Sequence, residues 1–170
     1  FSKRPRTVKD FTHAMIESLA KFFTRIAADV KLLCGIVYCS TVKLTTVVSQ
    51  ALRDAGLLVS VYHGQMAAAD RDASQLSWMS GDTRVMVATK AFGLGVDKQE
   101  VRYVVCYDLP GSLDDFVQAA GRSGRDGAPA IASVFWTYKD KNQWQQIFAL
   151  KEARGGSNKP DDNKTQRLYQ

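Results

Sequence analysis

Residues 35–62 read GIVYCSTVKLTTVVSQALRDAGLLVSVY. The first five are continuously apolar and rich in β-forming side chains, which is typical of a strand covered on both faces. Ser40 and Thr41 are N-cap candidates for a helix that extends to about Asp54 and closes at Gly56. Residues 58–62 then predict a second strand. The order strand, helix, strand indicates a unit in which a helix joins two parallel strands.

The same alternation continues on both sides of this stretch. Upstream, apolar residues spaced by three and four predict an amphipathic helix from Asp10: Phe11, Met15, Leu19, Phe22 and Ile26. Downstream we expect helices over 66–79, from Ser112 and over about 140–152, and strands over 85–88, 101–107 and 131–138. Ser112 followed by Asp115 resembles a capping box. We therefore predict an α/β fold, a parallel sheet with helices on both faces, whose post-strand loops share the edge where such folds bind ligands.

The composition is that of an ordinary globular protein. Hydrophobic residues make up 45% of the 170 and charged residues 24%, which excludes a disordered chain, a collagen-like fibre and a disulfide-dense mini-protein. No run approaches the roughly 20 apolar residues that span a bilayer, and the basic N-terminus lacks the apolar run of a secretory signal. The length favours one domain, over 10–153, with a linker over 1–9 and a polar tail over 154–170 that opens a truncated helix.

Charge and cysteines add little about partners. The net charge of +6 gathers at the two ends, which is compatible with solvated linkers as well as with nucleic-acid binding. The three cysteines, Cys34, Cys39 and Cys106, form no CxxC pair and are expected to be reduced thiols of an intracellular protein. With only His13 and His63 besides, no zinc site of plausible spacing can be assembled, so we expect no metal in this chain.

The strongest chemical signal is QAAGRSGRDG, residues 118–127. Arg122 and Arg125 follow an acidic-capped helix, and a spacing of three would place both guanidinium groups on one side. Glycines at 121 and 124 permit close approach of a phosphate, which arginine contacts in a bidentate manner. A phosphate clamp or arginine finger and a solvated glycine-rich turn both fit this pattern.

Three weaker signals follow predicted strands. The run ATKAFGLGVDK, residues 88–98, offers a hydroxyl at Thr89, glycines at 93 and 95, and Asp97 as an acceptor for a ribose, but an ordinary loop fits it better. Ser40 and Thr41 could form an anion site at a helix N-terminus, although plain capping is the simpler interpretation. A single histidine such as His63 after a strand is more often structural than catalytic.

Taken together, these segments resemble the second RecA-like lobe of superfamily 2 helicases, and the RecQ family in particular. Residues 38–41 look like motif IV, 62–64 with Arg71 like the YHAG…R segment, 87–98 like motif V, 101–110 like the VRFVVHFDIP strand and 118–127 like motif VI. Residues 1–5 are similar to the junction between the two lobes. The resemblance covers nearly the whole chain and thins after Tyr138.

The chain departs from the RecQ pattern at a few motif positions. Ala119, Ser123, Leu94 and Gln99 replace the usual Glu, Ala, Met and Pro, which leaves the subfamily open. The 170 residues contain no GxxxxGK[ST] and no DExH, so by this resemblance they are half of a motor and inactive alone.

The resemblance also implies roles. Arg125 would be the arginine finger, with Arg122 supporting it, and nucleotide would be contacted by Gln118, Asp97, Gly95 and Gly121. Phosphates of a single DNA strand would be contacted across the other side of the lobe by Ser40, Thr41, His63, Thr89 and Lys90. ATP and Mg²⁺ would be held mainly by an upstream lobe of the same protein.

The implied activity is ATP-dependent 3′-to-5′ unwinding of DNA in repair and recombination. The partners would be single-stranded or partly duplex DNA and the upstream lobe, with no membrane. The compartment would be the nucleus in a eukaryote or the cytoplasm in a bacterium. A related RNA helicase and a non-catalytic nucleic-acid or protein-binding module remain alternatives.

Overall fold

A parallel sheet forms the centre of the described part of the chain. The computed structural model of the chain describes residues 2–3, 6–23, 33–93 and 96–137. The strand order is β1-β6-β5-β2-β4-β3. The strands are β1 (Ser2–Lys3), β2 (Gly35–Tyr38), β3 (Val59–Tyr62), β4 (Val85–Ala88), β5 (Tyr103–Cys106) and β6 (Ile131–Trp136). Every pair is parallel, and central β2 is in register with both β4 and β5. The predicted α/β fold is confirmed.

Within the described residues, the helices that pack on the sheet are α1 (Val8–Phe23), α2 (Val42–Asp54), α3 (Ala68–Ser80) and α4 (Leu113–Ala120). Two predicted caps are present. The Thr41 hydroxyl accepts a hydrogen bond from the Leu44 N–H at 3.2 Å, and the Ser112 hydroxyl accepts one from the Asp115 N–H at 3.0 Å. These caps satisfy N–H groups that have no partner inside the helix.

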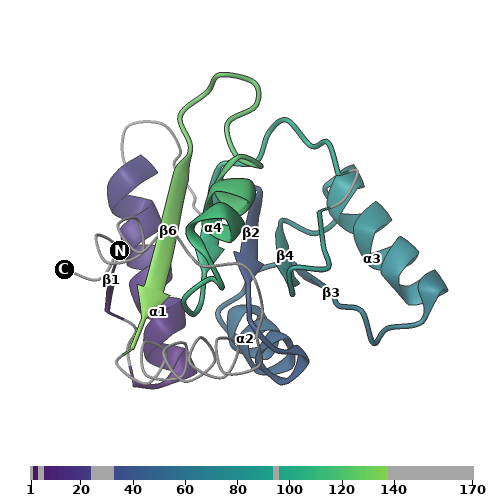
Figure 1. Cartoon of the computed structure of the whole chain (residues 1–170), viewed down its shortest axis with the longest axis horizontal. Helices are drawn as coiled ribbons and strands as arrows, with labels where there is room; N and C mark the ends of the chain where they lie inside the picture. Colours follow the sequence, from purple (N-terminus) through teal and green to yellow (C-terminus); the bar gives the residue numbers. More distant parts are fainter. Residues whose placement is uncertain (1, 4–5, 24–32, 94–95, 138–170) are drawn as a thin grey trace, which may run out of the picture.

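Alternate residues of the strands supply the two faces of the core. On one face, Val37 and Val105 pack with Phe11 and Met15 of α1 and Val48 of α2. The other face is covered by Trp78 of α3 and by the partly buried Phe116 and Ala119 of α4. Figure 1 shows α3 beside β3 at one end of the sheet and α1 beside β6 at the other. The helices therefore lie on both faces, as the alternation of elements predicted.

The N-terminal segment contributes a short strand to the sheet. Ser2 and Lys3, which lie within the predicted linker over 1–9, pair with Phe135 and Trp136 of β6, and the linker itself stays a prediction. Helix α1 begins two residues before Asp10, because the Thr7 hydroxyl accepts a hydrogen bond from the Asp10 N–H at 3.1 Å. Ile26, the helix over 140–152 and the tail over 154–170 lie outside the described residues, so the remaining boundaries stay predictions.

Candidate functional site

The carboxyl ends of β2, β4 and β5 surround a pocket of about 200 Å³, closed on one side by α4. In parallel sheets this is the edge where ligands bind. The pocket is lined by Tyr38, Cys39, Ser40, Lys90, Phe92, Cys106, Asp108, Leu109, Pro110, Gly111, Asp115, Gln118, Ala119 and Arg122. Ser40 and Lys90 were predicted to contact DNA, and Gln118 and Arg122 to serve the nucleotide. The structure therefore brings members of both groups to one pocket, whereas the prediction placed them on different sides of the lobe.

Asp108 is a pocket residue to which the sequence reasoning gave no role. It is 9% exposed and accepts a hydrogen bond from the Ser40 N–H at 3.1 Å and a short one from the Ser40 hydroxyl. The available signal was its position directly after a buried strand, in the run YDLP. Asp108 holds Ser40 in place, so the Ser40 hydroxyl is already engaged in this structure.

The neutral pocket side chains remain protonated near neutral pH. Burial raises the pKa of Tyr38 to about 12, although the neighbouring Arg122 guanidinium opposes the shift. Burial likewise raises the pKa of the Cys106 thiol to about 12. The Tyr38 hydroxyl donates a hydrogen bond to the Phe92 carbonyl at 3.3 Å. Neither group is thus available as a nucleophile or base at neutral pH.

Arg122 is fixed on the loop that follows β4. Its Nη1 donates a hydrogen bond to the Gly93 carbonyl oxygen. Gly93 has a φ of +126°, and a Cβ placed there would lie 2.4 Å from the Arg122 Cζ. Glycine is needed at this position for its backbone conformation and for the close approach of the guanidinium group.

Arg125 contacts the same loop at Val96 and Asp97, three and four residues after Gly93. Its Nη1 lies 2.7 Å from the Asp97 carboxylate and 3.3 Å from the Val96 carbonyl oxygen, while its Nε donates to the Gly121 carbonyl at 3.3 Å. The side chains of Arg125 and Asp97 are 35% and 72% exposed. Both arginines therefore project to one side, as the spacing predicted. They do so from a turn beyond the end of α4, in which Gly124 has a φ of +67°.

Several predicted contact residues, among them Thr41, Thr89 and His63, lie outside the pocket lining, whereas Lys90 belongs to it. Thr41 caps α2 and is exposed. The half-buried Thr89 donates its N–H to the Tyr62 carbonyl at 3.2 Å, and Lys90 beside it is exposed. His63 is half-buried, and its Nδ1 has no hydrogen-bond partner among the described residues. Gly121 ends α4, and Gly95 lies outside the described residues.

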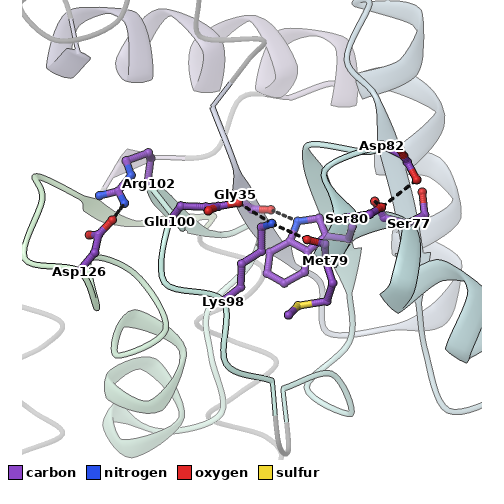
Figure 2. A network of polar contacts seen from close by, with 10 residues as sticks. Gly35, Ser77, Met79, Ser80, Asp82, Lys98, Glu100, Arg102 and Asp126 are labelled. Carbon is purple, nitrogen blue, oxygen red and sulfur yellow. Dashed lines mark hydrogen bonds and ion pairs between the residues drawn. The ribbon is translucent and has the colours of Figure 1, made fainter.

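Lys98, the last residue of the motif V-like run, is buried rather than exposed to a ligand. Its Nζ donates to the Met79 carbonyl at 2.9 Å, pairs with Glu100 at 2.6 Å and lies 5.5 Å from the centre of the Trp78 ring (Figure 2). The Trp78 Nε1 in turn donates to the Gly35 carbonyl at 3.3 Å. The ammonium group holds the pKa of Glu100 below its usual range. Lys98 thus anchors the end of this loop to α3, a structural role that the sequence reasoning did not assign.

A second ion pair fixes the turn that carries the arginines. Arg102 pairs with Asp126, and the pKa of Asp126 is lowered by this hydrogen bond and by the Ala128 N–H (Figure 2). The Gly124 N–H also donates to the Val101 carbonyl at 3.0 Å. The turn is therefore tied to the segment that precedes β5.

Comparison with known proteins identifies the family. The helicase conserved C-terminal domain matches residues 16–127, and the chain belongs to this family. Solved structures share the fold: Mss116p DEAD-box helicase domain 2 bound to an RNA duplex is 20% identical with a TM-score of 0.65, covering 91% of this chain and 58% of that one. The C-terminal domain of the DEAD-box protein Dbp5 is 24% identical with a TM-score of 0.61, covering 92% and 83%. These likenesses show the RecA-like fold alone.

Within this family, curated relatives of the chain include RecQ-family DNA helicases, which confirms the resemblance. The chain is 40% identical over 115 residues to the ATP-dependent DNA helicase hus2/rqh1 of Schizosaccharomyces pombe, covering 67% of this chain and 9% of that protein. It is 36% identical over 137 residues to ATP-dependent DNA helicase Q5 of Mus musculus, covering 78% and 14%. For ATP-dependent DNA helicase RecQ of Haemophilus influenzae the values are 36% over 128 residues, 75% and 21%. The chain thus spans about a fifth or less of these relatives.

Among residues 2–3, 6–23, 33–93 and 96–137, no three His, Cys, Asp or Glu side chains gather closely enough to hold a metal ion. In the same part of the chain, no helix has the length and apolar character needed to cross a membrane.

Proposed function

We propose that this chain is the second motor lobe of an ATP-dependent RecQ-type helicase that unwinds DNA in the 3′-to-5′ direction. One observation carries the proposal: two arginines of the motif VI-like turn are held by one loop at the ligand-binding edge of the sheet. ATP would lie between this edge and a first lobe of the same protein. The described residues offer no metal cage, so Mg²⁺ would be held by the nucleotide and that first lobe.

Arg125 is the proposed arginine finger. It is the more exposed of the two arginines, and its guanidinium group retains donors for the γ-phosphate oxygens of ATP. Arg122 is half-buried between Gly93 and Tyr38, which suits a supporting role. Gln118 is exposed at the pocket and would contact the nucleotide or couple the two sites, and Asp97, Gly95 and Gly121 complete the proposed nucleotide side.

The proposed contacts to single-stranded DNA are Ser40, Thr41, His63, Thr89 and Lys90. All five follow the carboxyl ends of β2, β3 and β4, which lie side by side in the sheet. Lys90 supplies an exposed positive charge there, and the hydroxyl groups of Thr41 and Thr89 would supply donors for phosphate oxygens, whereas the Ser40 hydroxyl would first have to leave Asp108. Such contacts position the strand without reading its sequence. A role in repair and recombination, in a nucleus or a bacterial cytoplasm, follows from this proposal.

The test is ATP turnover by the full-length protein, titrated in parallel with single-stranded DNA and RNA. We expect strong stimulation by DNA alone. Stimulation by RNA would instead indicate an RNA helicase, and no turnover with either would indicate a binding module. A finger contributes on the order of 10³–10⁵ in rate, so Arg125→Ala should lower kcat at least about a thousandfold while ATP binding changes little.

The control is Arg53→Ala. Arg53 is an exposed arginine near the end of α2, and its guanidinium group contacts Ser49 and the Val59 carbonyl at the opposite edge of the sheet. Its loss should leave kcat unchanged. Turnover of Arg125→Ala within threefold of wild type would refute the finger assignment.

A further inference from the structure

We infer that Asp97 is a positioning residue that orients the Arg125 guanidinium group, rather than a contact to the ribose of ATP. This inference rests on the proposed function of Arg125. The starting observation is that the Asp97 carboxylate lies 2.7 Å from Nη1 of Arg125, so the two predicted site residues contact each other directly.

Some N–H donors of Arg125 bond to the protein, and others have no acceptor among the described residues. Arginine has five N–H donors in a rigid plane. Nη1 is directed at Asp97 and the Val96 carbonyl, and Nε is directed at the Gly121 carbonyl. No described residue accepts a hydrogen bond from Nη2. Three acceptors therefore fix the plane of the group while its two Nη2 donors stay available for a phosphate, so Arg125 can keep its partner as it acts.

The backbone that carries Asp97 is itself held on both sides. Val96 is 7% exposed and donates its N–H to the Gly93 carbonyl at 3.3 Å. Lys98 is 6% exposed and anchored to Met79, Glu100 and Trp78. These two anchored neighbours hold the backbone of Asp97 in place, which limits where its exposed carboxylate can lie and so helps to preorganise the Arg125 guanidinium group.

The two roles for Asp97 predict different kinetics in the full-length helicase. If Asp97 positions Arg125, Asp97→Ala should lower kcat about ten- to a hundredfold, because a misplacement of about 1 Å can cost that much. The KM for ATP should change less than twofold. If Asp97 binds the ribose, Asp97→Ala should raise KM, and 3′-deoxy-ATP should bind the wild-type protein more weakly. Asp97→Asn keeps an acceptor at Oδ1 and should restore kcat to within about fivefold.

A double-mutant cycle tests whether Asp97 influences kcat through Arg125. If Asp97 acts through Arg125, Asp97→Ala should have no further effect on kcat in an Arg125→Ala background. Asp126→Ala is the matched comparison, because it removes another aspartate–arginine pair from the same turn but keeps the Asp97–Arg125 contact. It should lower kcat less than Asp97→Ala does, and equal losses in the two variants would show general loosening of the turn and overturn the inference.

The outcomes separate this inference from the function on which it depends. Normal turnover in Arg125→Ala would refute the finger itself. An inactive Arg125→Ala protein together with an Asp97→Ala protein of unchanged kcat would overturn the positioning role alone. A rise in the KM for ATP with unchanged kcat in Asp97→Ala would show instead that Asp97 contacts the ribose.

Discussion

Gly35 is a position at which the structure predicts a large effect of a single methyl group. Gly35 begins β2 and pairs with Val85 on one side and Tyr103 on the other. A Cβ at this position would lie 2.1 Å from Cε2 and Cζ of Tyr103 and 2.4 Å from Cδ2. Ordinary carbon contacts are about 3.5–4.0 Å long, so the ring or the strand would have to move by more than 1 Å. Gly35→Ala should therefore destabilise the lobe.

The magnitude follows from how little either group can move. Tyr103 is fully buried on the central strand β5. The Gly35 N–H donates to the Arg84 carbonyl at 2.9 Å, and its own carbonyl accepts from Trp78. Overpacking a core costs about 1–3 kcal/mol, and a clash with an immobile ring belongs at the upper end. The reduced entropy of the unfolded chain offsets about 0.4–1 kcal/mol, which leaves a loss of about 2–2.6 kcal/mol.

Urea unfolding of the 170-residue chain measures this loss. With an m value of about 2 kcal/mol/M, the midpoint should fall by about 1 M or more. Gly64→Ala is the control, because nothing lies within 4 Å of a Cβ at that exposed position, and its midpoint should stay near wild type. Tyr103→Val should recover part of the loss in the double mutant. Equal midpoints for Gly35→Ala and Gly64→Ala would refute the packing argument.

Two further predictions concern the loop and the thiols. Gly93→Ala forces an alanine to a φ of +126° and displaces the Arg122 guanidinium group. ATP turnover by the full-length protein should therefore fall at least about tenfold. Unchanged turnover would contradict the role of Arg122. Burial raises the pKa of Cys34 to about 11 and that of Cys106 to about 12, so these thiols should resist iodoacetamide at pH 8 until urea unfolds the chain. Thiols of the unfolded chain ionise at lower pH than these buried thiols. The free energy of unfolding should therefore be retained below about pH 8.5 and fall as the pH rises toward 11. A urea midpoint at pH 10 that is no lower than at pH 8 would contradict this.

The sheet and its helices were predictable because their signals are local. A buried parallel strand must be apolar along its length, as residues 35–39 are, and a helix N-terminus needs an acceptor such as Thr41 or Ser112. Strand β1 was missed because it has two residues, a serine and a lysine, and forms only by pairing with β6 across more than 130 residues of chain. No local pattern reports such a contact.

The residues of the site were easier to nominate than to connect. Asp97 and Arg125 were both nominated, but their contact joins positions 28 apart and depends on where the turn after α4 meets the loop after β4. Lys98 was given no role, because a lysine is expected to be exposed, and its burial depends on partners from α3 and from Glu100. These contacts are tertiary, and only the folded chain brings them together.

The loop over residues 89–98 is the place where the two proposed activities of this lobe can influence each other. Lys90, at its start, lies in the pocket and is proposed to contact DNA, whereas Gly93 and Asp97 hold the two arginines proposed to serve ATP. Between these points, the Phe92 ring packs against Tyr62 and Trp78 with centroids 5.0 and 5.5 Å apart. If Lys90 moved toward a phosphate, the backbone at residues 90 and 91 would have to change conformation. Otherwise Gly93 and the Arg122 side chain bonded to it would move as well. Few residues separate Lys90 from the Phe92 ring, and a closely packed core resists local deformation. We therefore expect the shift to reach Gly93 and Arg122.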